Sequence, residues 1–85
     1  MVDKKNAYDE ADLAEIMDAR GLACPLPLLK AKQTLANVAS GALIKVLATD
    51  KGSVRDFHSF IDLTEHELVS FEEADETYTY IIKKA

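Results

Sequence analysis

The chain has 85 residues and a formal net charge of −5 at pH 7. A chain of this length forms one small domain, which favours chemistry on its surface over a deep substrate cavity. The acidic balance argues against a direct grip on nucleic acid, which requires clustered lysine and arginine. No apolar run reaches the roughly 18 residues that a membrane-spanning helix needs.

The first twelve residues are rich in charge and have no regular apolar pattern. We interpret residues 1–12 as a flexible N-terminal extension and residues 13–85 as a single domain. The extension lacks the apolar core of a secretory signal. Together with the free cysteine, this predicts a protein of the cytoplasm, where thiols stay reduced.

The first half of the domain reads as a strand, a loop and a helix. Residues 14–19 are expected to form a strand that places Met17 and Ala19 on one face. Gly21 then breaks the strand and allows the chain to bend. Apolar residues at helical spacing predict a helix from Pro25 to about Val38, ended by the pair at positions 40–41 with a left-handed glycine.

The second half reads as strand, helix and hairpin. Residues 42–49 alternate as a strand, and Ser53 is the expected N-cap of a helix over residues 54–62. Residues 67–72 and 77–83 are expected to pair around the acidic turn 73–76. The order β-α-β-α-β-β predicts an α/β two-layer sandwich, a four-stranded mixed sheet with two helices on one face, whose first two strands are parallel.

Cys24 is the only cysteine, and both prolines of the chain follow it at once. We expect Cys24 at the N-cap, Pro25 at N1 and Pro27 at N3, with the sulfur at the positive end of the helix dipole. Because the prolines remove two N–H donors and leave mainly that of Leu26, the thiol pKa is expected to fall only modestly. The alternative is that a lone cysteine is a small buried hydrophobe.

The remaining charged residues allow two interpretations. The loop and helix positions can bring five basic residues to the Cys24 end, as a surface for an acidic partner, or these residues are simply solvated. The five are Arg20, Lys30, Lys32, Lys51 and Arg55. The two histidines have no ligand spacing around them, so no metal site is predicted.

The segment Met17–Pro27 resembles the signature of the TusA/SirA-like sulfur-carrier family, a Cys-Pro-x-Pro motif after a hydrophobic-Asp-x-x-Gly segment. The resemblance spans about residues 13–84. Other positions that fit the family are Lys32, Thr34, Asp50, Arg55, Asp56, residues 65–69, Tyr78 and Tyr80. Residues 58–61 lack the second cysteine that some members carry, which excludes an internal disulfide.

The resemblance implies the same two-layer fold and a sulfur relay. Such proteins accept sulfane sulfur from a cysteine desulfurase or similar donor as a persulfide and pass it to an acceptor protein, notably toward 2-thiolation of tRNA wobble uridine. Carried over, Cys24 bears the persulfide. Asp18, Gly21, Pro25 and Pro27 match positions that shape its loop, and Arg55 and Asp56 match a candidate partner-contact surface. Arg20, from the basic residues named above, is a further candidate partner contact. The transient persulfide replaces any cofactor, and the protein is a monomeric carrier rather than a stand-alone enzyme.

Two other functions remain open from the sequence. The protein can be a regulatory or scaffold module of the same family that binds partners through the Cys24 end without moving sulfur. Small sheets of this kind also bind RNA, although the acidic charge and the lack of an aromatic and basic cluster weigh against that.

Overall fold

Two helices and four strands follow one another in the order β-α-β-α-β-β, as the sequence predicts. The computed structural model describes residues 12–85, so all but the last residue of the expected N-terminal extension lies outside the described part. The elements are β1 (Leu13–Ala19), α1 (Leu26–Ala36), β2 (Leu43–Ala48), α2 (Gly52–Leu63), β3 (Glu67–Ala74) and β4 (Thr77–Lys83).

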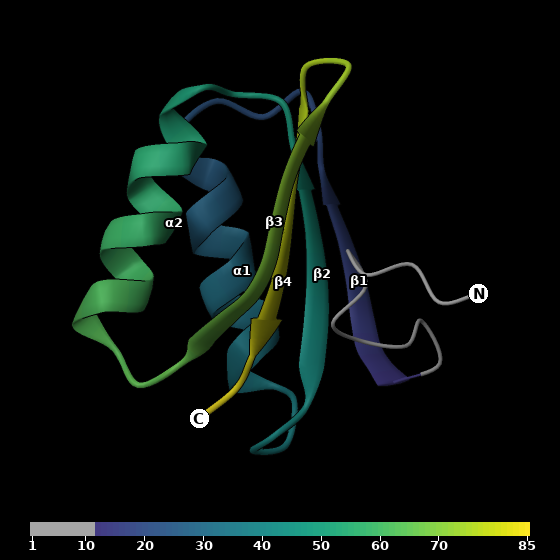
Figure 1. Ribbon diagram of the computed structural model, residues 1–85, viewed down its shortest axis with the longest axis vertical. Coiled ribbons are helices and arrows are strands. Elements are labelled where there is room, and N and C mark those ends of the chain that lie inside the picture. Colours follow the sequence, from purple (N-terminus) through teal and green to yellow (C-terminus); the bar gives the residue numbers. More distant parts are fainter. Residues whose placement is uncertain (1–11) are drawn as a thin grey trace.

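The strands form one mixed sheet in the order β1-β2-β4-β3. β1 runs parallel to β2, with Met17 opposite Val46, and β4 runs antiparallel to both of its neighbours. Both helices cover the same face of this sheet (Figure 1). The predicted fold class and the predicted parallel pair are therefore confirmed.

The core lies between the helices and the two central strands. Alternate residues of β2 and β4 point toward the helices, because side chains along a strand alternate between its faces. The Phe57 ring of α2 stacks on Tyr80 of β4, with 4.2 Å between the ring centroids and 14° between the planes. The buried cluster consists of Ala31, Leu35, Ile44, Val46, Ala48, Phe57, Tyr78, Tyr80 and Ile82.

The first helix is shorter than the sequence predicts. α1 ends at Ala36, two residues before the expected end at Val38. Asn37 ends it, because its side-chain amide donates to the carbonyl of Gln33 at 3.0 Å and so occupies one of the last helical carbonyls. Gly41 has the expected positive φ, +86°, but it lies in the turn that leads into β2.

The second helix begins earlier than predicted, at Gly52, and the expected N-cap role of Ser53 is wrong. The Gly52 N–H donates to the Asp50 carboxylate at 2.9 Å, so Asp50 supplies the side-chain acceptor at this helix start. Ser53 is buried inside the helix instead. Its hydroxyl shares a hydrogen bond of 2.8 Å with the Tyr80 hydroxyl, which pairs two polar groups in the core.

The hairpin between β3 and β4 is tighter than the sequence suggests. β3 extends to Ala74, which pairs with Thr77 across a turn of only two residues. Those two residues, Asp75 and Glu76, both have positive φ values, of 53° and 63°. This backbone matches the twist that two-residue hairpins require.

The outer strands β1 and β3 each contain one irregularity. In β1 the pairing register shifts between Leu13 and Glu15, and in β3 it shifts between Leu68 and Ser70. In the described part of the chain, no helix is long and apolar enough to cross a membrane.

Candidate functional site

The β1–α1 loop, the β2–α2 loop and the β3–β4 hairpin meet at one end of the sheet, which is the top of Figure 1. Both helices begin at this end. The β1–α1 loop carries Cys24, whose side chain is exposed and forms no disulfide. The alternative interpretation, a buried structural cysteine, is therefore wrong.

The start of α1 lies one residue later than expected. Pro25 is the N-cap, Leu26 is the first helical residue, and the Leu29 N–H makes the first helical bond, to the Pro25 carbonyl at 3.1 Å. Cys24 thus immediately precedes the N-cap. The Leu26 N–H, expected to remain for the sulfur, donates to the Ala23 carbonyl at 2.9 Å. Pro25 and Pro27 have no N–H, so α1 gives the thiol little donor support.

Asp18, near the end of β1, and Arg20, just after it, form a paired unit ahead of the cysteine. The Arg20 side chain donates through Nε and Nη2 to the two carboxylate oxygens of Asp18, each at 2.8 Å. These bonds hold the pKa of Asp18 at about 2, below its usual value of 3.8. Arg20 therefore has its guanidinium engaged within the loop, although both side chains stay about half exposed.

Two glycines fix the backbone around the thiol. Gly21 has a φ of +84°, which favours glycine, and its N–H donates to the Thr49 hydroxyl at 2.9 Å, tying the β1–α1 loop to the β2–α2 loop. Gly52 lies directly against Cys24. A side-chain Cβ at position 52 would lie 3.2 Å from the Cys24 Cβ and 3.4 Å from its Sγ.

The thiol of Cys24 donates a hydrogen bond to Oδ2 of Asp56, a half-buried carboxylate of α2. This hydrogen bond is the main cause of a raised thiol pKa. Loss of water contact and the negative charges of Asp56 and Asp50 raise the pKa further, and Arg55 lowers it. The expected modest fall in the Cys24 pKa is therefore wrong: the hydrogen bond to Asp56 is the first cause of a rise instead.

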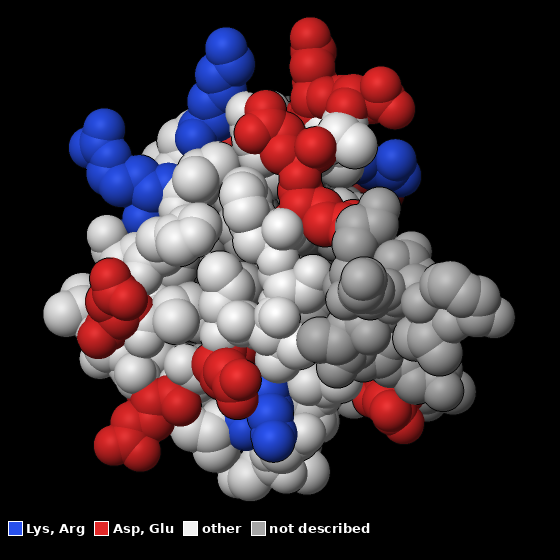
Figure 2. Space-filling view, in the orientation of Figure 1, with Lys and Arg blue, Asp and Glu red and all other residues white. Residues whose placement is uncertain are grey.

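The structure shows what three of the five basic residues expected around Cys24 contact or act on. Arg55 is the basic residue whose charge acts on the thiol, against the two aspartates. Arg20 is paired with Asp18, and the Lys32 ammonium lies over the Phe60 ring, 5.6 Å from its centroid. Figure 2 shows acidic side chains gathered at the hairpin end of the molecule, with basic side chains on both sides of them.

Sequence reasoning missed two members of this site. Asp50 was singled out only by resemblance, and Gly52 was not singled out. The signal that points to both is the Asp-x-Gly spacing directly after a strand, which is typical of an aspartate that caps the helix start. The sequence offered Asp56 as a candidate partner contact, and the structure shows it half-buried against the thiol.

A hollow of about 360 Å³ lies between the two helices and begins at Asp56. Its lining is mostly apolar and consists of Leu28, Lys32, Asp56, Ser59, Phe60, Leu63 and Thr64. Leu63 is 85 % exposed beside it, and Leu26 and Leu29 of α1 are also exposed. Exposed apolar groups next to a reactive side chain are typical of surfaces that contact other proteins.

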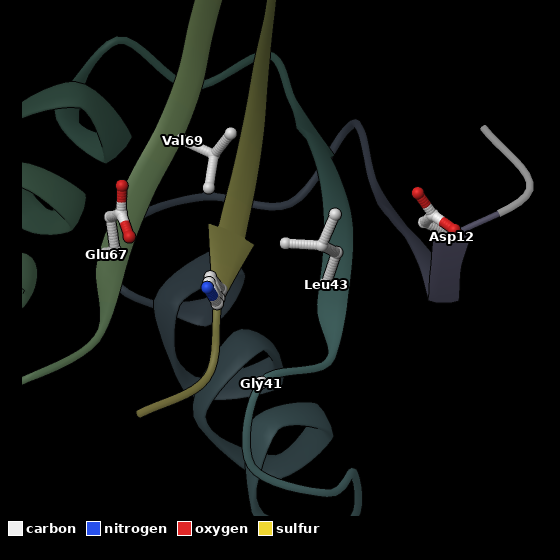
Figure 3. Close-up of a pocket in the computed structure, with 6 residues that line it drawn as sticks. Asp12, Gly41, Leu43, Glu67 and Val69 are labelled. Carbon is white, nitrogen blue, oxygen red and sulfur yellow. The ribbon is translucent and has the colours of Figure 1, made fainter. Parts of the chain in front are cut away.

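A second hollow, of about 560 Å³, lies at the opposite end of the sheet, on the face away from the helices (Figure 3). Leu43 and Val69 give it an apolar centre, with Glu67 and Lys83 beside them. Among the described residues, no cysteine, serine or histidine lines it. In residues 12–85, moreover, no three His, Cys, Asp or Glu side chains are grouped so that they could hold a metal ion.

The sequence profile described as Sulfurtransferase TusA matches residues 15–84. The chain belongs to the TusA family. Its relatives include the sulfur carrier protein TusA of Allochromatium vinosum, 45% identical over 88% of this chain and 99% of that protein, and the sulfur carrier protein TusA of Pseudomonas putida, 42% identical over 81% and 86%.

A solved structure supports the fold of this TusA-family chain. The crystal structure of a SirA-like protein from Desulfitobacterium hafniense superimposes with a TM-score of 0.72, covering 81% of this chain and 95% of that one. The two sequences are 24% identical, so this likeness bears on the architecture alone.

Proposed function

We propose that this protein is a sulfur carrier in which Cys24 accepts sulfane sulfur from a persulfide donor and passes it to an acceptor cysteine. The observation that carries the proposal is the exposed, unpaired thiol of Cys24 at the start of α1. It is the only cysteine of the chain, so no internal partner competes for the sulfur. Membership of a family whose named relatives are sulfur carriers supports the same function.

The transfer is an exchange between thiols. The Cys24 thiolate attacks the outer sulfur of the donor's Cys–S–SH group, the donor S–S bond breaks, and the donor leaves as a thiolate. Cys24 then carries the extra sulfur as Cys–S–SH. An acceptor thiolate repeats the attack on that outer sulfur, and Cys24 departs. Sulfane sulfur moves intact, so no external oxidant or reductant is consumed.

The donor we propose is a cysteine desulfurase or a protein of similar persulfide chemistry, and the destination we propose is 2-thiouridine in tRNA. Both rest on the sequence resemblance of the Cys24 motif. The free thiol fits a reducing compartment, so we place the reaction in the cytoplasm. We propose that the carrier acts as a monomer, since both partners must reach the same exposed thiol in turn.

Mass spectrometry tests the carrier function directly. The protein is incubated with a cysteine desulfurase and L-cysteine, and its intact mass is measured. We expect a gain of one sulfur atom that dithiothreitol removes. The Cys24→Ser variant is expected to keep the fold, measured by circular dichroism, and to gain no sulfur. Sulfur bound to the serine variant would overturn the proposal.

A second candidate function has one observation in its favour. The hydrogen bond from Cys24 to Asp56 keeps the thiol protonated, as in a module that binds partners through this end without sulfur transfer. The same measurement separates the two functions. A protein that binds several persulfide-loaded donors and still gains no sulfur would be such a module.

A further inference from the structure

The carrier chemistry needs a thiolate, and the surroundings of Cys24 oppose one. The thiol donates a hydrogen bond to Asp56. Asp50 also lies close by, because a Cβ added to Gly52 would be 2.9 Å from the Asp50 Oδ2 and 3.4 Å from the Cys24 Sγ. A donor's persulfide is attacked at a rate set by the thiolate fraction, the nucleophilicity of the sulfur and its access. The free protein therefore presents an accessible sulfur in its unreactive form.

Few positive charges offset these carboxylates. The charged groups that act on Cys24 are Asp56 and Arg55 from α2 and Asp50 from the β2–α2 loop, so acids outnumber bases. Arg20, from the thiol's own loop, has its guanidinium on Asp18. Lys32 of α1 lines the same hollow as Asp56, but its ammonium lies over the Phe60 ring, 5.6 Å from the centroid. A further cation on the Asp56 carboxylate can come from a partner.

The acidic surface continues from Asp50 to the β3–β4 hairpin. Tyr78 of β4 has a raised pKa, mainly because it is buried and also because Glu73, Glu76 and Asp50 act on it. Asp50 of the β2–α2 loop and the two hairpin glutamates therefore all lie near Tyr78. Figure 2 shows the acidic side chains of the hairpin end together. This charge distribution fits a partner with a basic surface.

We propose that Asp56 holds Cys24 as an unreactive thiol in the free protein, and that a protein donor activates it by placing a lysine or arginine side chain against the Asp56 carboxylate. The inference rests on the proposed carrier function and adds the chemistry by which a donor is recognised. It makes Asp56 a residue that touches the reacting sulfur and selects the donor at the same time.

The activated step balances without a co-reactant. Once a cation occupies Asp56, the hydrogen bond from Cys24 weakens and the thiol releases its proton to water. The thiolate attacks the outer sulfur of the donor persulfide, the donor S–S bond breaks, and the departing donor thiolate takes a proton from water. When the donor leaves, its cation leaves with it, and Asp56 is again free to act on Cys24.

The first experiment measures the thiol without any sulfur transfer. Alkylation of Cys24 by iodoacetamide is followed against pH in the wild type, in Asp56→Asn and in Asp62→Asn, a change of an exposed aspartate on the same helix. We expect the midpoint pH of the alkylation curve to fall only in Asp56→Asn. At neutral pH its rate rises about threefold per pKa unit lost, because a tenfold gain in thiolate is offset by weaker nucleophilicity. An unchanged midpoint overturns the proposal.

The second experiment compares two sulfur donors on the same variants. An alkyl persulfide without a basic group has no cation to place on Asp56, so it should load Asp56→Asn faster than the wild type. A cysteine desulfurase charged with L-cysteine should load Asp56→Asn more slowly, and the loading should lose part of its dependence on salt. If Asp56→Asn is loaded faster than the wild type to the same degree by both donors, the desulfurase places no cation on Asp56. That result would overturn activation by the donor.

Further outcomes keep the two proposals apart. If neither donor loads the wild type, the carrier function fails and donor selection fails with it, while the alkylation result still reports on Asp56. If both donors load the wild type but alkylation is unchanged by Asp56→Asn, only the present inference fails. Should Asp56→Asn not fold, Asp50→Asn is the second variant, and a smaller shift in the same direction is expected because Asp50 acts through charge alone.

Discussion

The two helices begin at the same end of the sheet, yet they act on Cys24 in different ways. The first turn of α1 contains two prolines and spends the Leu26 N–H on the Ala23 carbonyl, so it positions the thiol and does little to its charge. The first turns of α2 bring Gly52 against the thiol and Asp56 into a hydrogen bond with it. The acidity of the sulfur is thus set mainly by α2, while its placement depends on both helices.

The largest effect, on the free energy of unfolding, is expected from a substitution where α2 packs on the sheet. Phe57 is fully buried and stacks on Tyr80, so Phe57→Ala should lower the free energy of unfolding by about 3–5 kcal/mol. Leu63→Ala is the control, because that side chain is 85 % exposed on the same helix. Urea unfolding measures both. A loss at Phe57 no larger than at Leu63 would mean that this stacking does not anchor α2.

A smaller effect is expected at Gly52, where the change reaches the thiol. An added Cβ would lie 2.9 Å from the Asp50 Oδ2 and 3.2 Å from the Cys24 Cβ, so the Asp50 carboxylate must shift and the Cys24 side chain must give by a few tenths of an ångström. We expect Gly52→Ala to weaken the hydrogen bond from Cys24 to Asp56, to lower the thiol pKa and to speed alkylation of Cys24 at neutral pH.

The control for Gly52 is Gly41, whose Cβ would meet nothing within 4 Å but whose φ is +86°. Gly41→Ala should cost about 1–2 kcal/mol of stability through backbone strain and leave the alkylation rate unchanged. Faster alkylation in Gly41→Ala as well would indicate a general loosening of the fold rather than a local contact at position 52.

The smallest effect is expected at the exposed Asp18–Arg20 pair. The folded-state pKa of Asp18 is about 2, below the ordinary 3.8, so its contribution to stability is present above pH 3.8 and is lost as the pH falls toward 2. Asp18→Asn should therefore be slightly less stable than the wild type at neutral pH and equal to it near pH 2. Urea unfolding midpoints of the wild type and Asp18→Asn, measured across this pH range, give the difference in stability. A difference that persists near pH 2 would show that the Asp18–Arg20 pair is not its cause.

Much of the fold follows from alternation and helical spacing, because these record which face of each element is buried. Ile44, Val46 and Ala48 alternate along β2 as the pattern predicts, and all three are buried. The helix boundaries were less predictable. Serine is a common N-cap residue, but the Ser53 hydroxyl instead forms a hydrogen bond with the buried Tyr80 hydroxyl of β4, which lies far along the chain.

The site was predictable in its central residue and not in its electrostatics. The prolines after Cys24 and the resemblance both point to that thiol. Its acidity depends on Asp56, 32 residues further along the chain, and no local pattern shows that a half-buried carboxylate from another helix meets the sulfur. The expectation of a lowered pKa considered the helix dipole alone, and the tertiary contact reversed its sign.

The irregular pairing in β1 and β3 has a consequence for how copies of the protein meet. These are the two edge strands of an open sheet, where unpaired backbone groups invite another chain to add a strand. Each edge has a register shift, and each carries carboxylates, with Glu15 on β1 and Glu72 on β3. Bulges and charge of this kind discourage strand addition, so a crowded cell can hold many copies without aggregation through their sheets.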